Sequence, residues 1–266
     1  MSRRERSRTA RGRDAFNAYY TELYGNDWAA ITRAFAAEPI YESLTDGLLK
    51  PYHLDVSSAA AARCVPLPAG ARVLDLCAAP GGKCLVLATR IDVDGSIVAN
   101  EYSAGRRARL HRVLDEHLPK ELRERIRISA HDGRKWGLFE KDAYDVVVAD
   151  VPCSSERHVY NSEKHLAEWS PNRPITLARQ AGAFLAAALD ACKPGGYVLY
   201  CTCALSTDEN DGVIERAARR RVFVPLPPGI LAGRSTKYGE LVRPDLSGGA
   251  GPLFIALLKK PTPSEA

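Results

Sequence analysis

Two cysteines stand directly after predicted strands, Cys153 behind a proline and Cys203 behind a threonine. A cysteine inside a strand is most often a small buried hydrophobe, but a thiol at a strand end can act as a nucleophile. No Cys-x-x-Cys or histidine spacing accompanies the pair, so the sequence predicts no metal site. Asp150 lies three residues before Cys153 and adds a carboxyl group to the same strand end.

A thiol beside an acid suits attack on an electron-poor pyrimidine ring. A thiolate that adds to carbon 6 of cytosine makes carbon 5 nucleophilic enough to take a methyl group from a sulfonium donor. An acid near ring nitrogen 3, for which Asp150 is the candidate, would stabilise the charge that develops. The residue pattern alone leaves open whether Cys153 or Cys203 attacks.

A tight glycine turn predicts a site for a second, nucleoside-bearing molecule. The apolar run 72–77 fits a buried strand, and the Pro80-Gly81-Gly82 turn that follows leaves backbone amides free at a helix start. About 20 residues later a second predicted strand ends in Glu101, where a ribose diol would find an acceptor. The G-x-G-x-x-G spacing is absent, which disfavours a nucleotide-dependent oxidoreductase. The alternative is an ordinary strand-to-helix connection.

From residue 71 onward, strand and helix patterns alternate, which predicts an α/β fold with a mostly parallel sheet and helices on both faces. Seven strands are expected, at 72–77, 96–101, 125–130, 145–150, 196–201, 222–226 and 254–258. Helices are expected near 82–90, 104–117, 176–192 and 208–220. Ligands of such sheets bind beyond the carboxyl ends of the strands, so the acids and thiols at these ends should converge on one edge.

The residues before this pattern predict a separate N-terminal part. Six arginines in the first thirteen residues predict a basic disordered arm over 1–13 that suits phosphate backbones, with a mitochondrial presequence as the rival interpretation. A helical extension is expected over 14–65, with helices at 15–24, 27–37 and 56–64 and an irregular segment at 41–55. The Pro-rich linker 66–70 would begin the catalytic domain, 66–266.

The composition argues against a membrane-spanning protein and against a disulfide-stabilised one. The chain has 266 residues and a net charge of +5, and no stretch approaches the roughly 20 apolar residues that span a bilayer. Seven dispersed cysteines favour reduced thiols over a disulfide framework. We therefore expect no membrane association and a cytoplasmic protein, with a mitochondrial location as the alternative.

Three stretches, in order, resemble the Nop/Sun (RsmB-like) family of RNA cytosine-5 methyltransferases. They are residues 73–83, 150–154, and 200–206 with Glu209-Asn210. The resemblance covers about 55–260 and implies a Rossmann-like class I methyltransferase fold with S-adenosyl-L-methionine as methyl donor. It implies that the donor is bound by Cys77, Ala78, Ala79, Pro80, Gly81, Gly82, Lys83, Glu101, Asp132 and Asp150.

The same resemblance implies roles for the two thiols and a substrate. Cys203 would be the nucleophile, and Cys153 would assist product release. Residues 131–136, 151–158 and 239–244 are similar to the mitochondrial small-subunit rRNA branch. The implied substrate is structured RNA, foremost small-subunit rRNA; the alternatives are tRNA, or a non-catalytic RNA-binding role in ribosome assembly.

The chain departs from the family pattern at three positions, none of which removes a catalytic group. Cys84 stands where the family usually has threonine, Ala204 where serine is common, and Asp211 where glutamate is. Apart from the short N-terminal segment, the sequence shows no pattern expected of the RNA-binding extensions of larger members. We expect a monomer that a protein partner aids in recognising RNA.

Overall fold

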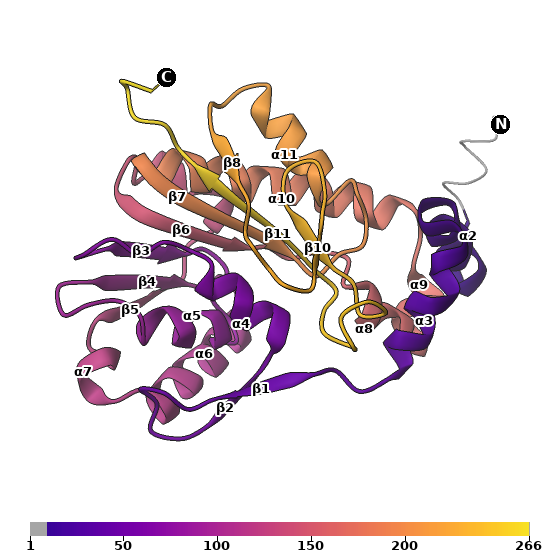
Figure 1. Ribbon diagram of the computed structural model, residues 1–266, viewed down its shortest axis with the longest axis horizontal. Helices are drawn as coiled ribbons and strands as arrows, with labels where there is room; N and C mark the ends of the chain where they lie inside the picture. The colour runs from indigo at the N-terminus through magenta and orange to yellow at the C-terminus, as the bar shows by residue number, and fades with distance from the viewer. Residues whose placement is uncertain (1–9, 266) are drawn as a thin grey trace.

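The computed structural model describes residues 10–265 and is built on one large twisted sheet (Figure 1). The strand order is β5-β4-β3-β6-β7-β11-β10-β9, and β8 also pairs with β11. Neighbours from β5 to β7 run parallel, and β11 runs antiparallel to β7. The strands are Arg72–Asp75 (β3), Ser96–Asn100 (β4), Ile126–Ser129 (β5), Tyr144–Asp150 (β6), Cys192–Thr202 (β7), Val224–Leu226 (β8), Gly233–Ser235 (β9), Glu240–Val242 (β10) and Leu253–Lys259 (β11).

The predicted α/β fold is confirmed, but the predicted number of strands was too low. Within the described chain this sheet has nine strands instead of seven, because β9 and β10 were not predicted. They form a short antiparallel hairpin in which each strand contributes three residues. Runs of three residues are too short to show an alternating apolar pattern, so the sequence gives them no strand signal.

Helices cover both faces of the sheet, as predicted (Figure 1). α10 and α11 lie over one face, and α4, α5 and α6 lie over the other. The helices around the sheet are Val56–Arg63 (α4), Gly82–Ala88 (α5), Ala104–His117 (α6), Lys120–Arg123 (α7), Asn172–Ala191 (α10) and Asp211–Ala218 (α11), with a 3-10 turn at Gly133–Leu138 (η2). Among the described residues, no helix combines the length and apolar character that a bilayer crossing requires.

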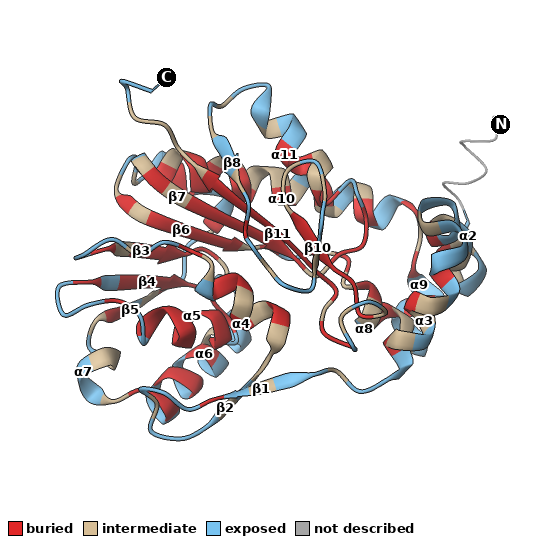
Figure 2. Ribbon diagram, viewed as in Figure 1, coloured by how far each residue is buried: buried red, intermediate tan, exposed pale blue. Residues whose placement is uncertain are grey.

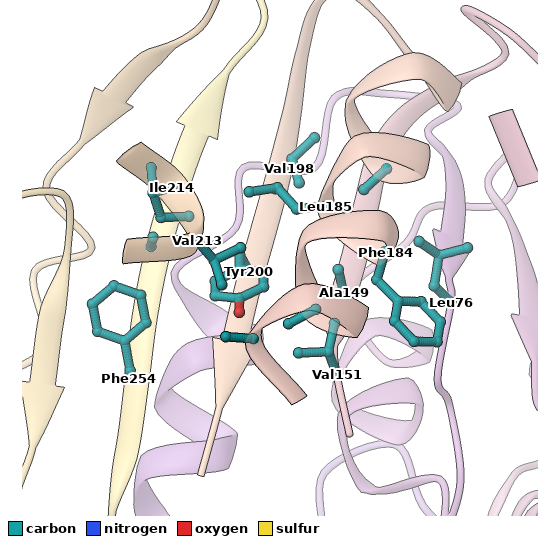
Figure 3. Close-up of a cluster of buried hydrophobic side chains, with 14 of the residues drawn as sticks. Leu76, Ala149, Val151, Phe184, Leu185, Val198, Tyr200, Val213, Ile214 and Phe254 are labelled. Carbon is teal, nitrogen blue, oxygen red and sulfur yellow. The ribbon is translucent and has the colours of Figure 1, made fainter. Parts of the chain in front are cut away.

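The central strands are buried on both faces, which explains why they appear in the sequence as continuous apolar runs (Figure 2). Figure 3 shows Phe184 and Leu185 of α10 packed over the sheet beside Val213 and Ile214 of α11. Tyr200 of β7 lies in this core, and its hydroxyl donates to the carbonyl of Glu209 at 2.6 Å. The core therefore fixes the end of β7, after which Cys203 follows.

The N-terminal helices pack against the part of the chain that follows β6 (Figure 1). They are Gly12–Tyr24 (α2) and Trp28–Ala36 (α3), joined by the 3-10 turn Gly25–Asp27 (η1), and their neighbours are Glu156–Tyr160 (α8) and Glu163–Glu168 (α9). Phe16 is fully buried, and its ring centroid lies 5.2 Å from that of Trp169. Helix α2 begins at Gly12, inside the predicted arm 1–13, so the predicted end of that arm at residue 13 is wrong. Residues 1–9 of the arm lie outside the described residues.

The segment 41–55, expected to be irregular, is a hairpin. Tyr41–Leu44 (β1) and Tyr52–Asp55 (β2) pair antiparallel, with Tyr41 opposite Asp55. Its strands carry as many polar as apolar residues, and of their eight residues three are exposed, four are intermediate and one is buried (Figure 2), so the apolar pattern that predicts a strand is missing. Leu44 packs with α4 and α5, which attaches the hairpin to the domain.

Candidate active site

The ends of β3, β4 and β5 are held together by one buried amide. The Asn100 side chain donates to the carbonyls of Leu76 at 3.0 Å and His131 at 2.9 Å, and accepts from the His131 amide at 2.9 Å. It also accepts from the Ser129 hydroxyl at 3.0 Å. This fully bonded side chain fixes three strand ends, and the sequence signal for it is a polar residue closing the apolar run 97–99.

The turn after β3 can be made only by glycine at its tightest point. Gly81 has φ +123°, and a Cβ there would lie 2.9 Å from the Cγ1 of Val113. A side chain would therefore clash, in a backbone conformation that favours glycine. The turn is tied to β4 by the Ala78 amide, which donates to the Asn100 carbonyl at 2.9 Å, and to α6 by Arg106, which donates to the Ala79 carbonyl at 2.7 Å.

A cavity of about 280 Å³ opens at this edge of the sheet, lined by Cys77, Glu101 and Asp132 among the predicted cofactor residues. It is completed by residues that were not predicted: Leu76, Asn100, Tyr102, Ser103, Arg106, Gly133, Arg134, Pro152, Gln180 and Phe184. Of the other predicted cofactor residues, Ala78, Ala79, Pro80, Gly81 and Gly82 form the neighbouring turn rather than this lining. Lys83 and Asp150 lie elsewhere.

Glu101 presents an acceptor to this cavity. Its Oε1 accepts from the Ser103 amide at 2.8 Å, whereas its Oε2 is buried and receives no hydrogen bond from the described residues. Arg106 Nη1 lies 3.5 Å from that Oε2, which supplies charge attraction without hydrogen-bond geometry. A buried acceptor without a donor fits a hydroxyl of a bound ligand.

Asp132 is engaged within the chain. Arg134 binds its carboxylate with two parallel hydrogen bonds, at 2.9 and 2.8 Å. Hydrogen bonds from the Arg134 side chain hold the pKa of Asp132 below its usual value. Asp132 can therefore accept from a ligand as an anion, through the lone pairs that Arg134 leaves free.

Lys83 and Asp150 form an ion pair between the turn and the end of β6. Lys83 Nζ lies 2.7 Å from Asp150 Oδ2 and 3.1 Å from the Ser58 hydroxyl, and the Lys83 side chain is 8% exposed. Burial alone would lower the pKa of Lys83, but the charge of Asp150 raises it above its usual value. Lys83 is therefore charged, and it orients the Asp150 carboxyl group.

The two thiols predicted to share the chemistry are in contact. Cys153 Sγ lies 3.0 Å from Cys203 Sγ, and the Ser155 hydroxyl lies 3.0 Å from Cys203 Sγ. A hydrogen bond from the Cys153 thiol, joined by one from Ser155, lowers the pKa of Cys203. The same bond raises the pKa of Cys153 well above its usual value. Cys203 is therefore the thiol that ionises first, and Cys153 donates to it.

Cys203, and not Cys153, lines a second cavity of about 440 Å³. Its wall comes from Pro39, Tyr41, Asp55, Ser57, Ser58, Ser155, Arg157, His158, Asn161, Gly251, Pro252 and Leu253. Ser58 connects this cavity to Asp150 through Lys83. The arrangement can bring a planar ring to a nucleophilic sulfur, with an acid nearby.

The sequence did not reveal most of this second wall. Ser58 lies on an Ala-rich helix, and Tyr41 lies in the hairpin taken for an irregular segment, so neither had a local signal. Ser155 and Arg157 had one, because they lie in the stretch 151–158 that contains the Pro-Cys pair. Among the described residues, no group of three or more His, Cys, Asp or Glu side chains could hold a metal ion.

Comparison with known proteins gives consistent matches. Residues 65–258 match the family described as 16S rRNA methyltransferase RsmB/F. The chain is 34% identical over 236 residues to the 5-cytosine rRNA methyltransferase NSUN4 of Mus musculus, covering 80% of this chain and 61% of the relative. It is 32% identical over 228 residues to the mitochondrial tRNA (cytosine(34)-C(5))-methyltransferase of Danio rerio, covering 80% and 62%. The chain thus spans about three fifths of these relatives' length.

A solved structure agrees with the fold. NSun6 from Pyrococcus horikoshii, determined with SFG, is 25% identical and superposes with a TM-score of 0.67, covering 79% of this chain and 53% of that one. The family match includes both thiol motifs, the glycine turn and the ends of strands β3 to β7. The chain therefore belongs to the RsmB/F family of S-adenosylmethionine-dependent RNA cytosine-5 methyltransferases.

Proposed function

We propose that this protein transfers the methyl group of S-adenosylmethionine to carbon 5 of a cytosine in structured RNA, with small-subunit rRNA as the substrate. One observation carries the proposal: Cys203 lines a cavity while Cys153 and Ser155 both lie 3.0 Å from its sulfur. These contacts favour the thiolate form of Cys203 at a position that a cytosine of the RNA can reach. The rRNA relative at 34% identity supports the substrate class.

The cavity beside Cys77 fits the cofactor, because the unpaired Glu101 Oε2 suits a ribose hydroxyl and Asp132 offers further acceptors. When bound, S-adenosylmethionine supplies an electrophilic methyl group. We assign binding of the cofactor to Cys77, Glu101 and Asp132, and the turn 78–82 supports them. Lys83 and Asp150 lie between the two cavities. Bare backbone at Gly81 and Gly82 allows close approach at the start of α5.

The proposed reaction balances as an addition followed by an elimination. The Cys203 sulfur forms a bond to carbon 6 and the ring electrons move to carbon 5, while nitrogen 3 holds a proton by donating a hydrogen bond to the Asp150 carboxylate, which offsets the developing negative charge. Carbon 5 then takes the methyl group as the bond between that group and the donor's sulfur breaks, which leaves S-adenosylhomocysteine. Loss of the nitrogen 3 and carbon 5 protons to water and cleavage of the bond between sulfur and carbon 6 return Cys203 as thiolate and release 5-methylcytosine. Cys153, 3.0 Å away, is proposed to assist this release.

The test is methyl transfer from labelled S-adenosylmethionine to purified small-subunit rRNA, naked and in particles, followed by nucleoside digestion. We expect label in 5-methylcytidine with the wild-type protein and none with Cys203→Ala. The matched control is Cys84→Ala, since Cys84 is a fully buried thiol on α5 away from both sulfurs. Label in another nucleoside would contradict the proposed reaction.

Two alternatives are tested by the same protein. The tRNA-modifying relative supports tRNA as a second substrate, so tRNA is assayed beside rRNA. A ribosome-assembly role without catalysis predicts that Cys203→Ala restores assembly in cells that lack the protein. The thiol pair argues against that role, because two reactive groups in contact serve no binding function.

Two further proposals concern the cellular location of the protein and its partners. The composition favours the cytoplasm, whereas the mitochondrial relative supports the mitochondrial alternative. We propose a monomer whose RNA recognition is aided by a protein partner. Light scattering with and without RNA measures the oligomeric state. The affinity of the purified protein alone for RNA measures whether it needs a partner.

A further inference from the structure

A buried polar cluster lies behind the two thiols, outside both cavities. Its members are Glu156, Glu209, Ser154 and Tyr20, each with 0% exposure. No lysine, arginine or histidine within residues 10–265 forms an ion pair with either carboxyl group, although sixteen ion pairs occur elsewhere, from Arg13–Glu163 to Lys260–Asp142. Two unpaired carboxylates buried side by side would be costly, so the cluster needs another explanation.

Ser154 lies between the two carboxyl groups. Its hydroxyl oxygen lies 2.5 Å from Glu156 Oε1 and is also in contact with Glu209 Oε1. Its amide donates to Glu209 Oε2 at 2.8 Å. Glu156 accepts two more hydrogen bonds, from the Tyr20 hydroxyl at 2.5 Å and from the Leu205 amide at 2.9 Å.

Counting protons decides which group is charged. A serine hydroxyl carries one proton, so it can donate to only one of the two carboxyl oxygens in contact with it. The other contact must then be donated by a carboxylic acid. Glu156 already accepts from Tyr20 and Leu205, which fits a carboxylate, and Glu209 accepts at only one oxygen. The proton therefore belongs on Glu209 Oε1.

We propose that Glu209 is held as a neutral acid that donates to Ser154, that Ser154 donates to the Glu156 carboxylate, and that this chain of hydrogen bonds positions the two thiols. Glu156 and Glu209 are thus positioning residues. Only the methyl-transfer readout of this inference rests on the proposed function.

The connections to the thiols are short. Ser154 follows Cys153, and the Leu205 amide bound by Glu156 lies two residues after Cys203. Asn210, next to Glu209, donates to the Ala204 carbonyl at 2.9 Å and accepts from Thr202 at 2.6 Å. The cluster therefore joins the loop after β6 to the loop after β7, and sets the 3.0 Å distance between the sulfurs.

The surroundings of Glu209 favour its neutral form. Burial, with the nearby charge of Glu156, raises the pKa of Glu209 to about 8. The titratable groups that face the cluster are Tyr19, Tyr20 and Tyr24 of α2, Glu156 of α8, Tyr200 of β7, Cys153, Cys203, Asp208 and, from α11, Arg216. Most are acids, so ionised Glu209 would repel both Glu156 and a Cys203 thiolate.

The first experiment measures alkylation of Cys203 by iodoacetamide, with site-resolved mass spectrometry and without RNA. Glu209→Ala should slow alkylation about 10-fold at pH 7, because Ser154 and its loop lose a partner. Glu209→Gln should restore the rate, since its amide donates to Ser154 and its oxygen accepts from the Ser154 amide. Glu156→Gln should slow alkylation as Glu209→Ala does, because its amide group would face a donor, either the Leu205 amide or the Tyr20 hydroxyl.

The pH dependence adds a readout that a merely structural role would not move. Wild-type methyl transfer should decline above about pH 8 as Glu209 ionises, and Glu209→Gln should remove that decline. The inference is overturned if Glu209→Gln lowers these rates as much as Glu209→Ala does while Glu156→Gln keeps the wild-type rates. That result would place the charge on Glu209.

Infrared spectroscopy keeps the inference testable if Glu209→Ala fails to fold. The wild type at pH 6 should show the carbonyl absorption of a buried protonated carboxyl group that Glu209→Gln lacks. Asp75→Asn is the matched control, because Asp75 is a buried carboxyl group outside the cluster whose pKa is also raised, and its loss should leave the Glu209 band in place. Absence of the Glu209 band refutes a neutral acid. Failure of wild-type methyl transfer on every RNA would instead refute the proposed function.

Discussion

At the scale of single residues, the reactivity of each group is determined by which neighbour donates to it. Cys203 accepts hydrogen bonds from Cys153 and Ser155, which lower its pKa, whereas the pKa of Cys153 is raised and this thiol stays protonated. Two thiols of the same intrinsic acidity thereby differ in pKa, which fits the proposed roles of Cys203 as nucleophile and Cys153 as proton donor. Differences of this kind give chemically identical residues different roles.

Cys153→Ala should separate the two roles. If Cys153 assists release, its loss lets Cys203 attack but leaves RNA attached to the protein, so a covalent adduct should accumulate on a denaturing gel. The Cys203→Ala variant should give no adduct, and Cys84→Ala should behave as wild type. Unchanged turnover in Cys153→Ala, with no adduct, would remove Cys153 from the mechanism.

Asp75→Asn should change how stability depends on pH. Burial, with the charge of Asp150, raises the pKa of Asp75 to about 7, and its side chain is 1% exposed. Between about pH 4 and 7 the unfolded chain loses this proton before the folded one, so the wild type loses stability as pH rises, by about 4 kcal/mol in total. The amide that replaces this carboxyl group in the variant has no proton to lose over that range.

Urea unfolding of both proteins from pH 4 to 8 measures this difference. The free energies of unfolding should diverge as pH rises, with the variant relatively more stable at pH 8. Other groups titrate alike in both proteins and cancel. Two curves that stay parallel over this range would show that Asp75 does not carry the effect.

At the scale of elements, one arginine joins three segments that are distant in the sequence. Arg157 on α8 donates to the carbonyls of Gly249 at 2.7 Å and Gly251 at 2.8 Å, and to that of Ala37 after α3 at 2.7 Å. The same side chain lines the cavity of Cys203. The N-terminal helices are therefore tied to the wall of the active site.

Arg157→Lys should weaken this junction, because an ammonium group cannot reproduce the planar set of donors. Loss of two or three of these bonds should cost about 2 kcal/mol of unfolding free energy, and the KM for RNA should rise more than kcat falls. The matched control is Arg127→Lys, since Arg127 is exposed on β5 and its side chain makes no hydrogen bond to the described residues. Equal stability of the two variants would contradict the role assigned to Arg157.

At the scale of the whole molecule, we expect charge to govern the proposed encounter with RNA. The net charge of +5 is small for an RNA-binding protein, and arginines 3, 4, 6 and 8 concentrate part of it before α2. Each phosphate contact that such residues make releases bound counterions, which makes affinity depend on salt.

Deletion of residues 1–9 should weaken RNA binding and flatten its salt dependence, while leaving α2 intact. If all four arginines contact phosphates, the slope of log affinity against log salt should fall by up to about 3. Fluorescence anisotropy over a salt series measures it. The same slope in both proteins would favour a targeting segment over an RNA-binding arm.

The sequence by itself determined the sheet and the chemistry at its edge. Strands β3, β4, β6 and β11 are apolar runs that end in polar or turn residues, and such runs are visible locally because burial on both faces demands them. The acids and thiols at these ends were identified for the same reason, since topology sends all parallel strand ends to one edge. Asp132 and Glu101 do meet Cys77 at one cavity there.

Only the tertiary structure decided which of these groups touch. Cys153 and Cys203 are 50 residues apart, and Ser154 and Glu209 are 55 apart, so no local pattern encodes either contact. The hairpin β1–β2 and the pair β9–β10 carry too few apolar residues to be predicted as strands from the sequence. They form because they pack against the rest of the folded chain. Whether a thiol faces a cavity or donates to its neighbour depends on how two loops pack, and packing is a property of the folded chain.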